Sequence, residues 1–143
     1  MRKMLASRRR MLDMRETQLR IATGDSAAAH GSEASLEQKR EQLKALAVHM
    51  HKAGERCREG RTLHSQLELV DRLRRAEDSI DGAIDQARQK TAQMERQRIA
   101  AYRKREMADQ LVERAAATVD AQTERKIGEQ PPARPRRMME RAR

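Results

Sequence analysis

The sequence predicts an all-α protein: a long antiparallel two-helix coiled-coil hairpin, with its first arm interrupted by a loop and a disordered basic C-terminal tail. Three observations support this fold class. The 143 residues are 38% charged and contain one aromatic residue, Tyr102, so a thick globular core cannot be assembled. Three prolines and six glycines are too few for a sheet with its frequent turns. Apolar residues recur every seven positions, as in coiled coils.

The first predicted helix covers residues 1–22, where apolar residues return at steps of seven. It is followed by residues 23–35, which are small and polar and include Gly24 and Gly31. That composition is typical of a loop. The apolar positions of the helix are Met4, Leu5, Met11, Leu12, Leu19, Ile21 and Ala22.

The second predicted helix covers residues 36–58, and Leu36, Leu43, Met50 and Cys57 follow one another in it at seven-residue intervals. Residues 59–62 contain Gly60 and predict the reversal of chain direction.

The third predicted helix covers residues 63–127 and carries two rows of seam positions. Gly128 and the prolines after it end this helix, and residues 131–143 form a Pro/Arg tail that we expect to be disordered. Arms of similar length on either side of Gly60 predict a hairpin over residues 1–130. One row is Val70, Glu77, Ile84, Thr91 and Arg98, and the other is Leu73, Ile80, Ala87, Met94, Ala101, Ala108 and Ala115.

The net charge of +10 is concentrated at the two termini. Residues 1–22 hold seven basic and two acidic side chains, and residues 131–143 hold five and one, whereas residues 71–130 are nearly neutral with thirteen and twelve. A hairpin brings residues 1–22 beside residues 110–143, so the sequence predicts one basic tip. Its candidate contact residues are Arg8, Arg9, Arg10 and Arg15.

Neither catalytic nor metal-binding residues are expected. His49 and His51 point in directions about 200° apart on a helix and cannot chelate one ion. No glycine-rich phosphate loop or nucleophile on a sharp turn is present, so we predict a non-enzymatic protein without cofactors. The single Cys57 and the lack of a signal peptide or long apolar run favour a cytoplasmic protein without membrane insertion.

Nucleic acid is disfavoured as a partner, because a single tyrosine offers no stacking platform and a loop separates the basic helix from the later heptads. Two alternatives stay open: a basic coiled-coil nucleic-acid-binding or scaffold protein, and a secretion chaperone that holds export substrates on its seam.

The layout resembles the FliJ/YscO family of stalk proteins, which includes the HrpO-type members, in type III secretion and flagellar export systems. The stretch from Leu69 through Leu73 to Ala76 is similar to the family's apolar positions after the turn, and Ile80 extends it. The stretch from Glu106 to Asp120 is similar to the family's charged C-terminal segment.

This resemblance implies a stalk peripheral to the membrane-embedded secretion apparatus. Its paired basic termini would enter the hexameric secretion ATPase, and Leu69, Leu73, Ala76 and Ile80 would contact the cytoplasmic domain of the export gate. Secretion chaperones are further possible partners. The same four residues are equally compatible with an intramolecular seam.

Overall fold

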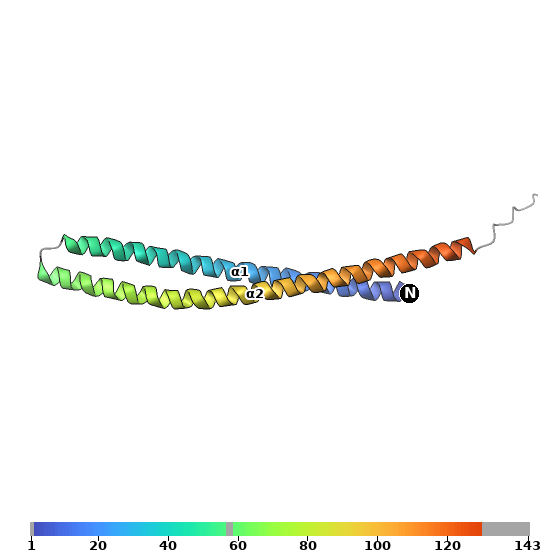
Figure 1. Cartoon of the computed structure of the whole chain (residues 1–143), viewed down its shortest axis with the longest axis horizontal. Coiled ribbons are helices and arrows are strands. Elements are labelled where there is room, and N and C mark those ends of the chain that lie inside the picture. Colours follow the sequence, from blue (N-terminus) through green and yellow to red (C-terminus); the bar gives the residue numbers. More distant parts are fainter. Residues whose placement is uncertain (1, 57–58, 130–143) are drawn as a thin grey trace, which may run out of the picture.

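The computed structural model describes residues 2–56 and 59–129, and these form a rod of two antiparallel helices (Figure 1). Helix α1 spans Arg2–Glu55 and helix α2 spans Gly60–Gly128, 54 and 69 residues long. At 1.5 Å per residue, the helices are about 80 Å and about 100 Å long. The predicted all-α hairpin is therefore confirmed.

The seam between the helices follows the predicted seven-residue rows. In α2 both rows are buried or half-buried, from Val70 to Ala115, and Leu36, Leu43 and Met50 are half-buried in α1. Ile84 is the most deeply buried side chain, with 1% of its surface exposed. Each buried side chain packs against the facing helix alone, because a two-helix hairpin has no third element for it to contact.

The predicted loop at residues 23–35 is wrong: α1 is helical through all of it. Ser26 and Ala29 are among the most buried residues of the protein, at 4% and 6% exposed, because their small side chains pack against α2. Gly24 and Gly31 face solvent, and a Cβ added at either would meet no atom within 4 Å. Each glycine costs about 1 kcal/mol of helix propensity, which packing of the opposite face offsets.

The chain reverses a few residues earlier than predicted. α1 ends at Glu55, before the predicted boundary at 58, and α2 begins at Gly60, inside the predicted turn 59–62. Glu59 is extended, with φ −96° and ψ 123°, and its carbonyl accepts the first helical hydrogen bond, from the Leu63 amide at 3.0 Å. Cys57, in the predicted second helix, and the predicted tail at 131–143 lie outside the described residues.

Contacts between the helices fix one antiparallel register. The Arg105 guanidinium lies 3.5 Å from a Glu16 carboxylate oxygen, and the Lys44 ammonium lies 4.0 Å from Glu77. Near the start of α1, Arg8 donates a hydrogen bond to the Leu111 carbonyl at 3.1 Å. Residues 2–22 therefore lie beside roughly residues 99–119, a range that overlaps the predicted facing segment 110–143 at residues 110–119; residues 120–128 of α2 continue past the first turn of α1 (Figure 1).

Candidate interaction surfaces at the two ends of the rod

Large exposed apolar side chains gather at two separate parts of the rod, and Ile127, 66% exposed near the end of α2, lies outside both. We call residues 3–21 with 99–119 the terminal region, and residues 46–55 with 60–70 the turn region. Within the described part of the chain, residues 22–45 and 71–98 between them expose no large apolar side chain. The terminal region exposes Met4, Met11, Met14, Ile21, Ile99, Tyr102, Met107 and Leu111, and the turn region exposes Leu46, Val48, Leu63, Leu67 and Leu69.

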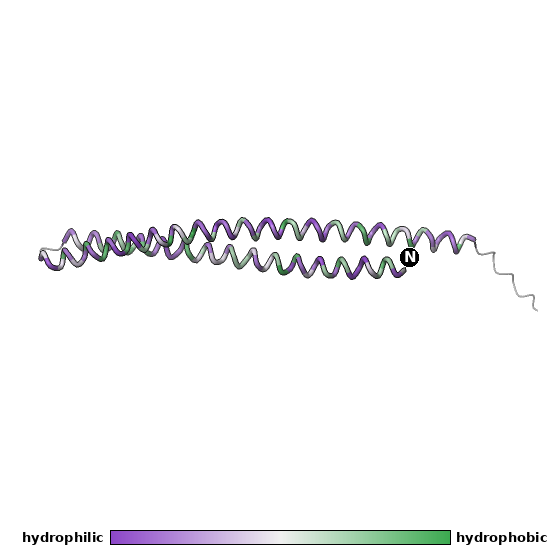
Figure 2. Tube along the Cα trace, turned by 90° about the horizontal axis from the view of Figure 1, so that it is seen from below, coloured by the Kyte–Doolittle hydropathy of each residue, from purple (hydrophilic) through white to green (hydrophobic). Residues whose placement is uncertain are grey.

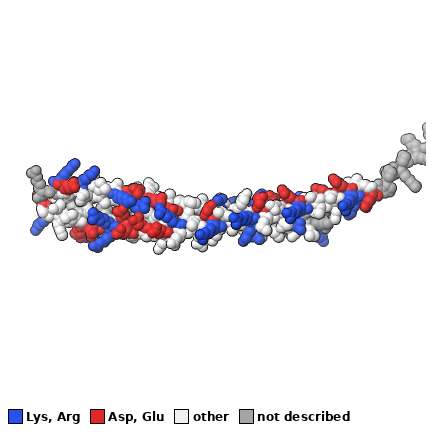
Figure 3. Space-filling view, viewed as in Figure 1, with Lys and Arg blue, Asp and Glu red and all other residues white. Residues whose placement is uncertain are grey.

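Both helices are amphipathic, and charge varies along the rod. In Figure 2, apolar and polar residues alternate along both helices, as an amphipathic pair requires. On the face in Figure 3, Lys and Arg lie along the whole rod, whereas Asp and Glu gather mainly in the half nearer the turn. The two regions differ in charge, because the terminal region holds ten basic and five acidic side chains and the turn region holds two and two.

The four predicted arginines of the basic tip have different environments in the terminal region. Arg9 and Arg10 are exposed on α1. Arg8 and Arg15 are half-buried, and Arg15 donates a hydrogen bond to the Gln18 side-chain oxygen at 2.9 Å. Of the four, Arg9 and Arg10 are therefore the ones exposed to solvent. Arg8 helps to join the two helices through its hydrogen bond to the Leu111 carbonyl.

A second basic segment of α2, which sequence reasoning missed, begins just before the terminal region and ends inside it. Residues 96–105 contain five Lys and Arg side chains and no acidic one. The near neutrality of residues 71–130 hides this segment, because residues 71–95 hold six acidic against five basic side chains. A charge count in windows of about ten residues, close to three helical turns, would have found it.

The four predicted gate-contact residues after the turn do not share one surface. Leu69 is 45% exposed, whereas Leu73, Ala76 and Ile80 are half-buried. Leu73 and Ile80 belong to a seam row and face α1, so the interpretation of these two as an intramolecular seam is correct. The accessible apolar residues near Leu69 are Leu63 and Leu67, which the prediction did not include.

Two shallow grooves that share His51 and Val70 lie next to each other in the turn region. Val48 lines the first groove and Leu67 lines the second. Lys44, Arg74 and Glu77 border the first groove and give it both signs of charge. This arrangement offers an apolar floor with polar margins, which suits a protein surface.

Polar contacts between the helices occupy the middle of the rod. Arg88 binds Glu37 at 2.9 Å and lies 3.6 Å from Glu33, and the hydrogen bond from Arg88 to Glu37 raises the pKa of the guanidinium. The Glu95 carboxylate accepts hydrogen bonds from Arg98 and from the Ser26 hydroxyl, the latter at 2.9 Å. These two hydrogen bonds lower the pKa of Glu95 to about 2, and the bond from Arg98 has the larger effect.

The described residues contain no group of three or more His, Cys, Asp or Glu side chains placed to hold a metal ion. His49 and His51 are both exposed on the last turns of α1. In the described ranges no helix is long and apolar enough to cross a bilayer.

Together, these observations define an antiparallel helical hairpin with a separate group of exposed apolar side chains toward each end. Comparison of the chain with family models, with curated proteins and with solved structures finds no match.

Proposed function

We propose that the protein is a stalk of a type III secretion apparatus, which couples the export ATPase ring to the export gate and catalyses no reaction of its own. The observation that carries this proposal is the presence of two groups of exposed apolar side chains toward opposite ends of one helical rod. Large exposed apolar patches on a protein are typical of binding surfaces. A rod with one such surface at each end can hold two partners apart and connect them.

The terminal region is the proposed ATPase-binding end. Residues 2–21 of α1 hold seven basic and two acidic side chains, and the facing residues 99–119 of α2 hold four and three. A concentration of positive charge steers association with an acidic protein surface and makes the rate depend on salt. Arg9 and Arg10 are the predicted contact residues that are also exposed.

The turn region is the proposed gate-binding end. Leu69 keeps its predicted role because nearly half of its surface is exposed. Leu67 lies on the adjoining groove and is 55% exposed. Leu73 and Ile80 pack in the seam and hold α2 against α1, so they keep Leu67 and Leu69 in place. They do not form part of the proposed contact.

The ATPase-binding end can be tested by reversing charge on exposed arginines. The variant Arg9→Glu/Arg10→Glu should lose binding to the ATPase of its own secretion system and stimulation of ATP hydrolysis, with unchanged helicity. The control Arg72→Glu/Arg75→Glu makes the same charge change in the other half of the rod and should retain both. Unchanged stimulation by the first variant would contradict the proposal.

The gate-binding end can be tested with Leu69→Asp alone. Leu73→Asp is unsuitable, because a carboxylate in the seam would damage the hairpin itself. Leu69→Asp should abolish capture of the gate's cytoplasmic domain in a pull-down, whereas Ile21→Asp, at a 59% exposed residue in the terminal region, should not. Full capture by Leu69→Asp would remove Leu69 from the contact.

Nucleic-acid binding is a second candidate, and the basic segment at residues 96–105 favours it. The two candidates differ in salt dependence. Binding to a DNA or RNA duplex should fall by several orders of magnitude between about 50 mM and 200 mM salt if six or more phosphates are neutralised. Tight duplex binding with that slope, together with no response of the ATPase, would favour nucleic acid over the stalk function.

A further inference from the structure

The seam of the terminal region has two edges, and they differ in chemistry. Along one edge, Arg105 lies 3.5 Å from Glu16 and 3.1 Å from Asp109, so ion pairs cover the junction of the helices. We call the other edge the open edge. It is formed by Met4 and Met11 of α1 and by Lys104, Met107 and Leu111 of α2.

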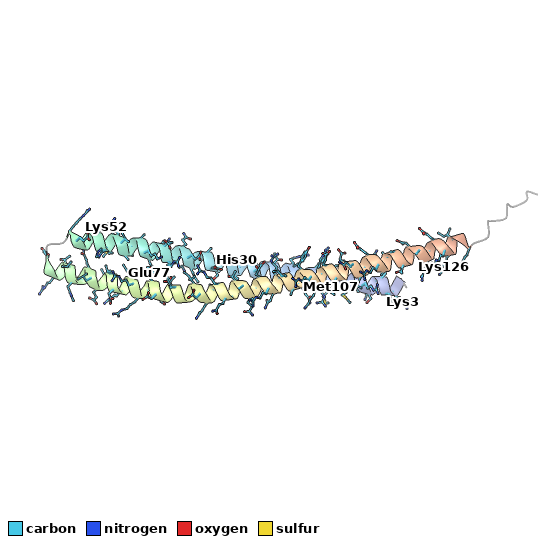
Figure 4. All side chains as sticks on the ribbon, in the orientation of Figure 1. Lys3, His30, Lys52, Glu77, Met107 and Lys126 are labelled. Atoms are coloured by element: carbon cyan, nitrogen blue, oxygen red, sulfur yellow. The ribbon has the colours of Figure 1, made fainter. Side chains whose placement is uncertain are left out.

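The open edge contains a small apolar groove. Met11, Met107 and Leu111 surround it, at 42%, 65% and 39% exposed, and the buried Ala108 forms its floor. Met4 lies seven residues before Met11 and therefore extends the same face by two turns. Met107 lies on α2 where this helix runs beside the first half of α1 (Figure 4). Methionine side chains adapt to differently shaped apolar partners.

Cations border this groove without acidic partners. Lys104 and Arg15 line it, and Arg8 reaches the Leu111 carbonyl at the same place. Among the described residues, none of these three side chains forms an ion pair with a carboxylate, whereas Arg105 on the opposite edge forms several. The groove thus has an apolar centre with positive charge on its margin that the hairpin does not neutralise.

We infer that the open edge of the terminal region binds an acidic amphipathic helix of a partner protein, which lies along the groove and completes a three-helix bundle. The groove lies between two helices. Met4 and Met11 lie one heptad apart on α1, and Met107 and Leu111 lie one turn apart on α2, as the face for a third helix requires. A helix of about 12 residues would span the roughly 17 Å from Met4 to Arg15. Leucine-like residues on its inner face would cover the methionines, and carboxylates beside them would pair with Lys104 and Arg15.

Charge disfavours a second copy of this chain as the occupant. The facing segments 2–21 and 99–119 together hold eleven basic and five acidic side chains, so two terminal regions repel each other. This inference rests on the proposed function, because it specifies the chemistry of the partner at the ATPase-binding end.

The inference can be tested with the full chain labelled at its methionine methyl groups and observed by NMR. The probe is a designed helical peptide of three heptads, roughly 21 residues, with Leu on its inner face and Glu beside it. We expect this peptide to shift the methyl signals of Met4, Met11 and Met107. The signals of the seam residues Met50 and Met94 should not move, because both lie away from the open edge.

Two further comparisons separate charge from apolar contact. A peptide with Lys in place of Glu should bind at least about tenfold more weakly, because like charges then face each other. The variant Lys104→Glu should weaken the acidic peptide by a similar factor. The control Lys52→Glu, the same substitution on an exposed residue near the turn, should leave its affinity unchanged.

Several results would overturn the inference. These are unmoved Met11 and Met107 signals with the acidic peptide, equal binding of both peptides, and equal effects of Lys104→Glu and Lys52→Glu. Shifts of the same methyl groups that depend on protein concentration without any peptide would instead assign the open edge to self-association. If the peptide fails to bind while Arg9→Glu/Arg10→Glu abolishes ATPase stimulation, the inference fails and the proposed function stands. If the peptide binds but the ATPase does not respond to the protein, the proposed function fails.

Discussion

Replacement of Ile84 by alanine should remove the largest single contribution of one side chain to the stability of the hairpin. Ile84 is 1% exposed at a seam position near the middle of α2. The change deletes three carbon atoms at about 0.8 kcal/mol each, so about 2.4 kcal/mol of burial is lost. The higher helix propensity of alanine restores about 0.4 kcal/mol. The expected loss in the free energy of unfolding is therefore about 2 kcal/mol.

The measurement is urea denaturation followed by circular dichroism, with Ile99→Ala as the matched control. Ile99 lies in the same helix and is 40% exposed, so the propensity gain is the same and the lost burial is much smaller. We expect Ile99→Ala to change the free energy of unfolding by less than about 0.5 kcal/mol. Equal destabilisation by the two variants would refute the assignment of Ile84 to the seam and the register derived from it.

Two other predictions follow from α1 and from its polar contacts with α2. Gly24→Ala and Gly31→Ala should each raise the free energy of unfolding by about 0.5 to 1 kcal/mol in the same urea assay, because both residues are helical and a Cβ would meet nothing within 4 Å. No gain from either would indicate a loop at residues 23–35. The Glu95 carboxylate, with a pKa of about 2 in the folded state against an ordinary value of 4.5, should stabilise the fold above pH 4.5 and lose this effect as the pH falls toward 2. The difference in melting temperature between the wild-type protein and Glu95→Gln should shrink across that range, and a constant difference would contradict the role of the Arg98 and Ser26 hydrogen bonds.

The seam could be predicted from sequence because burial in a two-helix rod depends almost entirely on spacing. Every seam row assigned in α2 is buried or half-buried, even where the residue is polar, as at Glu77, Thr91 and Arg98. The failure at residues 23–35 has the opposite cause. Composition alone cannot distinguish a flexible glycine-bearing loop from a helix whose inner face is small, and only the packing of Ser26 and Ala29 against α2 decides between them.

The candidate surfaces could be predicted only in part, because they depend on which residues face each other. A hairpin places the two basic ends together, but its register was needed to show that Arg103, Lys104 and Arg105 belong to the same region as Arg8. The same limit applies after the turn. Apolar residues at every third or fourth position define one face of a helix, but the spacing does not show whether that face contacts α1 or solvent. Leu73 contacts α1, whereas Leu69 is exposed to solvent.

The polar residues in the middle of the seam oppose sliding of one helix along the other. A slip of one heptad in either direction keeps the apolar rows aligned, but it would move Arg40 from Asp81, 3.5 Å away, to a position opposite Arg74 or Arg88. The same slip would place Lys44 against the buried side chains of Val70 or Ile84. Each native pair is worth at most about 1 kcal/mol, yet every neighbouring alignment carries a like-charge contact or a desolvated cation. A load applied along the rod is therefore transmitted from end to end and is not absorbed by a change of alignment.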